Sequence, residues 1–326
     1  MKVLELFGGI GACTKALERL GLDFELADYV EIDKFAVASF NSMHGTNFEP
    51  QDITKWDKNI DADFIMHGSP CQDFSLTGLQ AGGDEGSGTR SSLMYETIRI
   101  VEKLKPKYVI WENVKNVVSK RHKHNFDSYI NKMGELKYTS YWQVLNAKDY
   151  GIPQNRERVF TVSIRKDTDQ GFEFPTKKEL KLRLKDMLEN EVDEKYFMSE
   201  KMKKYILSSG TKNFYYKPEI DLEIARPLTA TMHKSHRASS DNYVTDGNRI
   251  RKLTPKECWR LMGFDDVDVD KAKLVNSDTQ LYKQAGNSIV VNVLEAILTN
   301  LVINPSQRCN EQLSLFDLGE VAHESA

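Results

Sequence analysis

The 326-residue chain has few cysteines, and none of them forms a C-x-x-C pair. Their spacing therefore predicts neither a zinc site nor a disulfide framework, and we expect four free thiols and no bound metal. Long hydrophobic runs are also missing: no segment approaches the roughly 18 apolar residues of a membrane span. The N-terminus does not begin with a basic segment followed by a long apolar one, so we expect no targeting leader. We therefore expect a cytoplasmic protein with no membrane partner. The four cysteines are Cys13, Cys71, Cys258 and Cys309.

An excess of positive charge is missing as well, because the formal net charge is -3. Any surface that binds nucleic acid must then be local. Residues 226–260 contain eight lysines and arginines against three acidic residues, a local excess of +5. This stretch is a candidate phosphate-facing surface, and a solvated protein face is the alternative.

The chain does have enough apolar residues, 40% of the total, to bury a sizeable core and to form two domains. Strand-like and helix-like segments alternate through the first half, which predicts a parallel sheet with crossover helices. Two further strand-like runs resemble a hairpin that completes the sheet. The expected strands are Lys2–Phe7, Glu25–Glu31, Asp63–His67 and Tyr108–Trp111, the helices are Gly11–Leu20, Lys34–Met43, Ser92–Leu104 and Asn125–Met133, and the hairpin is Tyr138–Leu145 with Arg158–Ile164.

The character of the sequence changes after Pro175. A charged, helix-prone stretch covers 177–207, and polar, irregular sequence follows to about Arg251. A final amphipathic helix, 289–301, carries apolar residues at helical spacing and should pack on the first domain. We therefore expect an α/β domain over 1–172, a smaller irregular domain over 173–270, a segment over 271–303 that returns to the first domain, and a flexible tail over 304–326.

Glycines follow the first strand in Phe7-Gly-Gly-Ile-Gly11, where the chain turns into a helix. Such a turn lets a ligand approach the backbone, and Glu31, twenty residues later, is placed to accept hydrogen bonds from ribose hydroxyls. These features predict a nucleoside-type cofactor, with a turn used only for tight packing as the alternative. Thr14 stands where the dinucleotide fingerprint needs a third glycine, which disfavours NAD. Asp52, at the end of a third strand-like run over 47–53, could meet an adenine amino group.

Reactive side chains follow other strands. Cys71 and Glu112 each come just after an expected strand, and ligands of parallel sheets bind beyond the carboxyl ends of the strands. In extended backbone Gln154, Arg156 and Arg158 share one face because the side-chain period is two. Each alone has an ordinary structural explanation: Cys71 could be a small buried apolar residue, Glu112 a cap at a strand end, and the arginines part of a solvated surface. Together they predict one pocket that holds Cys71 and Glu112, with the arginines reaching it from the hairpin.

These segments, in this order, resemble the DNA cytosine-C5 methyltransferases, and the similarity covers nearly everything from Lys2 to Leu301 except the interior of the second domain. Ser69 departs from the family, which often has an aromatic residue before the proline, and we expect it to alter packing and not chemistry. The resemblance implies a Rossmann-like methyltransferase domain with a mostly parallel twisted sheet, plus a smaller target-recognition domain. The motifs are Phe7-Gly-Gly-Ile-Gly11, Pro70-Cys-Gln72, Glu112-Asn-Val114, Gln154-Asn-Arg-Glu-Arg158, Leu253-Thr-Pro with Arg260-Leu-Met-Gly-Phe264, and Gly286-Asn-Ser288.

The family resemblance also implies a mechanism. Cytosine C5 is a poor nucleophile, but a thiolate that adds at C6 turns the ring into an enamine whose C5 can attack a methyl donor. By resemblance Cys71 is this nucleophile, and Glu112 holds N3 and the exocyclic amine. Arg158, with Arg156 beside it, stabilises O2 and the nearby phosphate. Loss of the C5 proton and then of the thiol restores the aromatic ring.

The same resemblance implies S-adenosylmethionine as the cofactor. Phe7 would stack on adenine, Glu31 would bind the ribose, Ile32 and Ile53 would cover the adenine faces, and Asp52 would accept from its amino group. The cofactor-binding residues it implies are Phe7, Gly9, Gly11, Glu31, Ile32, Asp52, Ile53, Pro70, Leu93 and Asn287.

A base within a duplex offers no face to a thiol, so the resemblance implies that the target cytosine is flipped out of duplex DNA. Residues 77–92 contain five glycines and resemble a lid that closes over this base, with an ordinary surface loop as the alternative. The second domain would read a short specific sequence from the major groove. The candidate DNA-binding residues are Gln72, Thr77, Arg90, Lys234, Arg237 and Arg249.

The tail contains Gln312, Leu313, Ser314, Leu315 and Phe316, which look like the pentapeptide that bacterial proteins use to bind the DNA polymerase sliding clamp. A flexible segment with these apolar residues can fold into a pocket at an entropic cost. A tail that packs back on its own domain is the alternative. Other expectations are a monomer of bacterial or phage origin, with a cognate restriction endonuclease as a further partner.

Three other functions remain open at this stage. One branch of the family methylates tRNA, although the recognition segment of that branch is not evident here. A catalytically silent DNA-binding module is disfavoured by the intact set of Cys71, Glu112 and Arg158. An NAD oxidoreductase is disfavoured by Thr14.

Overall fold

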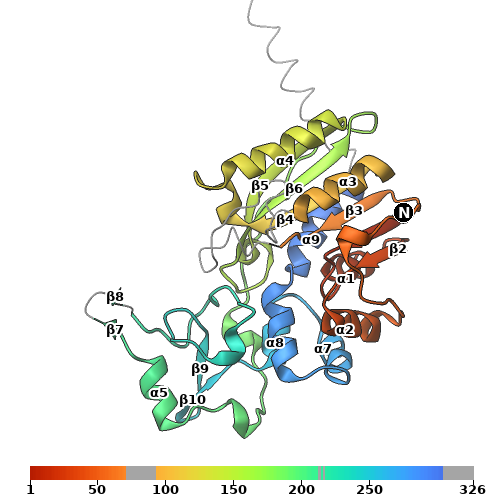
Figure 1. The fold of residues 1–326 in the computed structure, drawn as a ribbon. Coiled ribbons are helices and arrows are strands. Elements are labelled where there is room, and N and C mark those ends of the chain that lie inside the picture. The colour runs from red at the N-terminus through yellow and green to blue at the C-terminus, as the bar shows by residue number, and fades with distance from the viewer. Residues whose placement is uncertain (71–92, 212–213, 216, 304–326) are drawn as a thin grey trace, which may run out of the picture.

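The computed structural model describes residues 1–70, 93–211, 214–215 and 217–303 (Figure 1). Within this part of the chain, one six-stranded sheet has the order β2-β1-β3-β4-β6-β5. Strands β1 to β4 are parallel, and β5 and β6 form an antiparallel hairpin at one edge, as the sequence predicted. The strands are β1 Lys2–Leu6, β2 Glu25–Val30, β3 Phe64–His67, β4 Tyr108–Val114, β5 Tyr138–Asn146 and β6 Glu157–Arg165.

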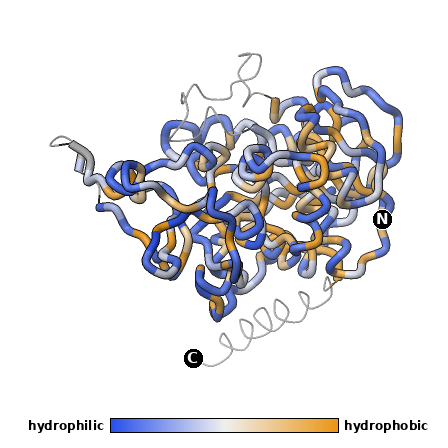
Figure 2. Tube along the Cα trace, turned by 90° about the horizontal axis from the view of Figure 1, so that it is seen from below, coloured by the Kyte–Doolittle hydropathy of each residue, from blue (hydrophilic) through white to orange (hydrophobic). Residues whose placement is uncertain are grey.

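Helices cover both faces of the sheet, because successive residues of a buried strand point to opposite sides. In β1, Val3 joins the apolar cluster that contains α1 and α9, whereas Leu4 and Leu6 join the cluster that contains α3 and α4. Figure 2 shows hydrophobic segments concentrated in the interior, with hydrophilic segments around them. The first four helices begin and end close to their expected positions: α1 Ala12–Arg19, α2 Lys34–His44, α3 Met94–Leu104 and α4 Lys123–Glu135. The expected Rossmann-like fold with a mostly parallel sheet is confirmed.

Two expectations about local structure are wrong. Residues 47–53 form no strand, since the described backbone there is irregular and leads into the 3-10 turn Ile53–Lys55. Pro50 lacks the backbone donor that a central strand needs. The stretch 177–207 contains only one α-helix, α5 Glu200–Ile206, besides the 3-10 turns Leu184–Met187 and Glu194–Tyr196. Its charged residues have good helix propensity, but a helix in a protein depends mainly on packing of an apolar face.

The smaller part of the molecule is largely irregular. Its described strands are short: β7 Gly210–Thr211 with β8 Phe214–Tyr215, and β9 Tyr243–Asp246 with β10 Arg249–Lys252. Helix α6, Pro255–Arg260, begins with a capping box in which Thr254 and Glu257 satisfy each other's backbone N–H groups. Helix α7, Asp266–Lys273, follows and packs on α2.

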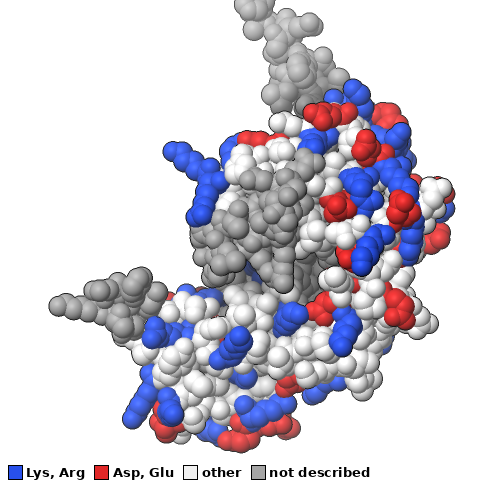
Figure 3. Space-filling view, viewed as in Figure 1, with Lys and Arg blue, Asp and Glu red and all other residues white. Residues whose placement is uncertain are grey.

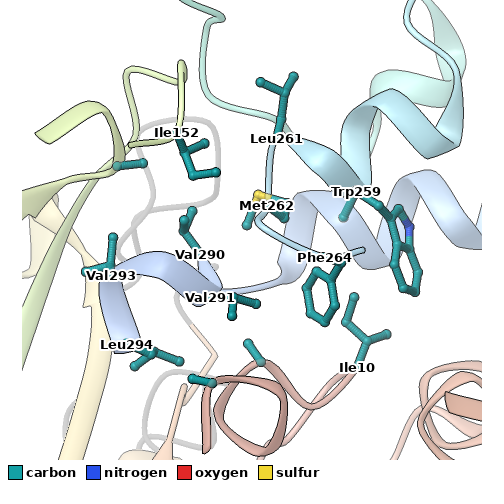
Figure 4. Close-up of a cluster of buried hydrophobic side chains, with 14 of the residues drawn as sticks. Ile10, Ile152, Trp259, Leu261, Met262, Phe264, Val290, Val291, Val293 and Leu294 are labelled. Carbon is teal, nitrogen blue, oxygen red and sulfur yellow. The ribbon is translucent and has the colours of Figure 1, made fainter. Parts of the chain in front are cut away.

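Residues 253–264 share a core with the sheet domain. Trp259, Leu261, Met262 and Phe264 are buried in one cluster with Ile10 from the glycine turn and with the final helices (Figure 4). These helices are α8 Asp278–Asn287 and α9 Val291–Leu298, followed by the π-helical turn Thr299–Ile303. The expected helix 289–301 therefore spans two helical types. The combined stretch Asp278–Ile303 is long and apolar enough to cross a membrane, but half of it is buried in the protein and α9 packs on α1, as a core helix does.

Candidate active site

The turn between β1 and α1 requires glycine at three positions for different reasons. A Cβ on Gly8 would lie 2.5 Å from the Tyr29 ring, and a Cβ on Gly11 would lie 2.5 Å from the Phe40 ring. Gly9 and Gly11 have φ angles of 55° and 76°, in the left-handed region that favours glycine. A Cβ on Gly9 would meet nothing within 4 Å, so the outer side of this turn is open to a ligand.

Glu31 lies beside this turn, immediately after β2. Its carboxylate accepts hydrogen bonds from the backbone N–H of Gly9, at 3.0 Å, and of Asp33, at 2.8 Å. Burial raises the pKa of Glu31, and these two donors oppose that rise. The next residue, Ile32, is 68% exposed, which leaves a large apolar side chain in contact with solvent. The turn, the carboxylate and the apolar side chain together fit an adenosine, with its sugar hydroxyls and its flat base.

Other predicted cofactor residues lie at the ends of nearby elements. Asp52 precedes a 3-10 turn, and its carboxylate accepts from the backbone and side chain of Thr54, which lowers the pKa of Asp52. Ile53 is buried, and the partly buried Phe7 has a φ of 54°. Leu93 immediately precedes α3, and the exposed Asn287 ends α8.

The end of β3 lies against the end of β4. Trp111 donates its indole N–H to the hydroxyl of Ser69 at 2.9 Å, and the Asn113 amide donates to the Ser69 carbonyl at 3.2 Å. A Cβ on Gly68 would lie 3.8 Å from a carboxylate oxygen of Glu112. Ser69 is thus a buried hydrogen-bond partner for a neighbouring indole. Cys71, Gln72, Thr77, Arg90 and the expected lid 77–92 lie outside the described residues.

Glu112 and Arg158 meet as the sequence predicted. The Arg158 Nε lies 3.1 Å from a carboxylate oxygen of Glu112, and the two side chains are 20% and 11% exposed. Burial raises the pKa of Glu112 despite the positive charges of Arg158 and Arg156. The site therefore presents a carboxyl group that holds a proton more readily than usual, beside a guanidinium that always carries charge.

Arg156 is oriented differently. It is 3% exposed, and its guanidinium donates to the backbone carbonyls of Leu228, Gly286 and Ser288 at 2.9, 3.0 and 2.8 Å. The two predicted arginines therefore have different contacts. Arg158 contacts Glu112, whereas Arg156 donates hydrogen bonds to two backbone segments and contributes positive charge near the Glu112 carboxylate.

Most basic side chains of the stretch 226–260 are paired with carboxylates, which favours the alternative of a solvated protein face over one phosphate-facing surface. Five of its eight basic side chains form ion pairs, and Arg251 is only 1% exposed. Figure 3 shows separate lysines and arginines over the smaller domain and no continuous basic patch on that face. Lys234 is exposed, and the Arg237 guanidinium lies 5.7 Å from the centre of the Tyr205 ring. The paired basic residues are Arg226 with Glu219, Arg249 with Glu194, Arg251 with Glu257, Lys256 with Asp270 and Arg260 with Asp266.

The sequence did not indicate the residues that fix the backbone around the site by hydrogen bonds. Trp111 and Asn113 flank Glu112 in β4 and donate hydrogen bonds to Ser69, and their adjacency to the predicted carboxylate was the available signal. Asn242 pairs with the backbone of Arg226 by two hydrogen bonds, and no sequence pattern indicated it.

Comparisons with known proteins identify similar sequences and a similar fold. The family model described as C-5 cytosine-specific DNA methylase matches residues 1–302. The chain is 43% identical over 243 residues to the type II methyltransferase M2.ScrFI of Lactococcus lactis subsp. cremoris, covering 74% of this chain and 67% of that protein. It is 34% identical over 318 residues to the type II methyltransferase M.SsoII of Shigella sonnei, covering 92% and 80%.

A solved structure of a DNMT2 variant from Spodoptera frugiperda has the same fold. Its TM-score is 0.72 at 22% identity, and the similarity covers 92% of this chain and 99% of that one. The family match spans nearly the whole described chain and includes the glycine turn, the Glu112 strand end and the Arg158 strand. The chain therefore belongs to the C-5 cytosine-specific DNA methylase family.

Proposed function

We propose that this enzyme methylates C5 of a cytosine flipped out of duplex DNA, at a short specific sequence, with the residue roles given below. The observation that carries the proposal is the partly buried pair of Glu112 and Arg158, at 3.1 Å, beside Gly68, which lies three residues before Cys71. Such a pair can bind the N3 and O2 edge of a pyrimidine, because the carboxyl group shares a proton with N3 and the guanidinium donates to O2.

In the proposed sequence of steps, the Cys71 thiolate forms a bond to C6 while Glu112 supplies a proton to N3. The ring becomes an enamine with electron density at C5, and Arg158 stabilises the negative charge that develops on O2. When bound, S-adenosylmethionine would supply an electrophilic methyl group to C5, with its sulfur leaving as the neutral thioether of S-adenosylhomocysteine. The C5 proton then leaves to a base, the sulfur–C6 bond breaks, and the proton on N3 returns to Glu112, so that the thiolate is regenerated.

The glycine turn and its neighbours would hold the cofactor. The open space over Gly9, the exposed Ile32 and the carboxylate of Glu31 support this assignment. Glu31 would accept from the ribose hydroxyls, and Asp52 would offer its second oxygen to the adenine amino group. The remaining proposed cofactor residues are Phe7, Gly11, Ile53, Pro70, Leu93 and Asn287.

The second domain, residues 173–270, would carry target recognition, with 271–303 returning to the catalytic domain. Lys234 and Arg237 are the proposed DNA contacts among the described residues, since no ion pair binds either of them there. Arg249 could join them by exchanging Glu194 for a phosphate, because its guanidinium is exposed. Gln72, Thr77 and Arg90 are assigned by family resemblance.

A transfer assay tests the function. Purified full-length protein with radiolabelled S-adenosylmethionine should label unmethylated duplex DNA and not tRNA, and it should form a denaturation-resistant adduct with duplexes that contain 5-fluorocytosine. Fluorine blocks the final proton loss and so traps the covalent intermediate. The variant Cys71→Ser should form no adduct, and Glu112→Gln should lose at least a hundredfold in rate because it cannot supply the proton. Labelling of tRNA alone, or an adduct with Cys71→Ser, would refute the proposal.

We also propose a monomeric, cytoplasmic enzyme of bacterial or phage origin that accompanies a restriction endonuclease. Sequencing of methylated DNA from expressing cells would give the protected sequence, and an endonuclease that still cleaves that methylated DNA would not be its partner. The tail residues Gln312 to Phe316, outside the described chain, are proposed to bind the sliding clamp. Equal clamp binding by the full protein and by a variant with Leu315→Ala and Phe316→Ala would contradict this.

A further inference from the structure

Residues 225–231 lie between the smaller domain and the sheet domain. Their backbone is bonded to the loop before β6: Ala225 donates to the Pro153 carbonyl and accepts from the Asn155 N–H, both at 2.8 Å. On the other side, the buried Asn242 bonds both to the N–H of Arg226, at 2.8 Å, and to its carbonyl, at 3.1 Å. This segment is therefore fixed to both parts of the molecule along its first residues.

Gln154 connects the same segment to α6. Its side chain is fully buried, accepts from the Leu228 N–H at 3.0 Å, and donates to the Leu261 carbonyl at 2.7 Å. A buried amide whose two ends are both satisfied fixes two backbone segments relative to each other.

Arg156 adds a connection to the end of α8. Its guanidinium bonds at once to the carbonyl of Leu228 in the segment and to the carbonyls of Gly286 and Ser288, which flank Asn287. A guanidinium is planar and presents its donors in fixed directions, so the three carbonyls are fixed relative to one another. Two residues further along the chain, Arg158 binds Glu112.

The approach of α8 to the segment is very close. A Cβ on Gly286 would lie less than 3.0 Å from backbone atoms of Thr229 and Ala230, so only glycine fits. Through the contacts of Gln154, Arg156 and Gly286, segment 225–231 of the second domain thus lies against the end of α8 that carries Asn287 and beside the start of β6, the strand of Arg158.

We propose that Arg156 is a positioning residue that couples target recognition to catalysis, holding segment 225–231 in register with Glu112 and Asn287 without touching the base. The inference rests on the proposed function. If the segment moves when the second domain binds a wrong sequence, the same guanidinium displaces the backbone beside Asn287 and the strand that carries Arg158. Discrimination between DNA sequences would then depend on Arg156.

The first test needs no activity. Amide hydrogen exchange of the full-length variant Arg156→Lys should rise at least tenfold in two separate regions together, 225–231 and 284–290, because an ammonium group cannot span three carbonyls. The matched control is Arg251→Lys, another buried arginine, whose guanidinium binds Glu257 and Asp246. It should leave both regions at wild-type exchange rates. Faster exchange in neither region, or in only one of them, overturns the coupling.

The second test measures specificity. Unmethylated genomic DNA is treated with each variant to equal total methyl incorporation, and the methylated positions are sequenced. We expect kcat/KM of Arg156→Lys to fall at least tenfold, and the share of methylation at sites differing by one base pair to rise at least fivefold. The control Arg251→Lys should keep the wild-type pattern. A wild-type pattern for Arg156→Lys overturns the inference and leaves the proposed function intact, whereas failure of wild-type protein to methylate DNA refutes the function and leaves the exchange test to decide the coupling.

Discussion

Two buried carboxyl groups show how the partners of a residue decide its role. Glu112 lies in β4, two residues before its end, and meets a guanidinium, so that burial and positive charge act on its pKa in opposite directions. Glu5 lies within β1, 2% exposed, and accepts hydrogen bonds from the N–H and hydroxyl of Thr14 at 2.5 and 2.6 Å. It thereby fixes the start of α1 beneath the glycine turn. Burial raises the pKa of Glu5 to about 7, and the Thr14 donors limit that rise.

The raised pKa of Glu5 makes folding depend on pH. An acid with a pKa near 4.5 when unfolded and about 7 when folded contributes stability below pH 4.5, and this contribution is lost as the pH rises through 7. The free energy of unfolding of wild type minus that of Glu5→Gln should therefore fall by about 2.5 kcal/mol between pH 5 and 8. Urea unfolding at each pH measures it.

Glu25→Gln is the control for this pH dependence, since it removes a carboxylate at the exposed start of β2. It should produce no comparable slope. A constant difference between wild type and Glu5→Gln over this range would mean that Glu5 titrates in the folded protein as it does in the unfolded chain.

Single residues also mark the limit of sequence reasoning. Glu112 and Arg158 could be predicted to meet, because Glu112 lies near the carboxyl end of β4 and Arg158 lies near the start of β6, the neighbouring antiparallel strand of the hairpin. The partner of Ser69 could not, because Trp111, which donates to it, lies 42 residues away in the sequence. The different roles of Arg156 and Arg158 were equally hidden, because a side-chain period of two predicts one face for both, whereas in the structure Arg156 precedes β6 and its N–H bonds to the carbonyl of Gln154.

At the scale of elements, the sheet was predictable because each strand is short, apolar and followed by a helix with its own period. The irregular segments 47–53 and 177–207 were not, because their conformation depends on distant partners. Residues 184–187, for example, bury Leu184 and Met187 in the large apolar cluster as a single turn, and local helix propensity did not indicate this. The close approach of α8 to segment 225–231 also joins residues far apart in the sequence, and the glycine of the motif Gly286-Asn-Ser288 was the only indication of it in the sequence.

A pair of glycine substitutions tests that approach. Gly286→Ala should lower the free energy of unfolding by more than about 2 kcal/mol, because a Cβ there collides with the backbone of Thr229 and Ala230. Gly134→Ala, within α4, meets nothing within 4 Å and should raise it by about 0.5–1 kcal/mol through better helix propensity. Thermal and urea unfolding measure both. Equal effects of the two substitutions would show that α8 does not lie against the segment in solution.

At the scale of the whole molecule, charge decides how the enzyme can bind DNA. The net charge of -3 disfavours binding of the negatively charged DNA. In addition, most cations of the 226–260 stretch are paired with carboxylates of the same domain. The local charge excess of +5 counted from the sequence therefore overstates the positive electrostatic potential of this surface, because composition does not show which charges are paired. We therefore expect binding to depend on the few cations that form no ion pair among the described residues and on the contacts of the flipped base.

The salt dependence of DNA binding follows from this distribution of charge. Each phosphate contact contributes about 0.9 to the slope of log Kd against log salt concentration, through release of counterions. Lys234→Ala and Arg237→Ala should each lower that slope by about 1 and weaken binding similarly for all sequences. Lys256→Ala, in which the lost lysine was already paired with Asp270 at 2.7 Å, should leave the slope unchanged. Fluorescence anisotropy with a labelled duplex at several salt concentrations measures this. If Lys256→Ala lowered the slope as much as Lys234→Ala, the ion pairs of the second domain would have to open on DNA, and the whole 226–260 stretch would face the phosphates after all.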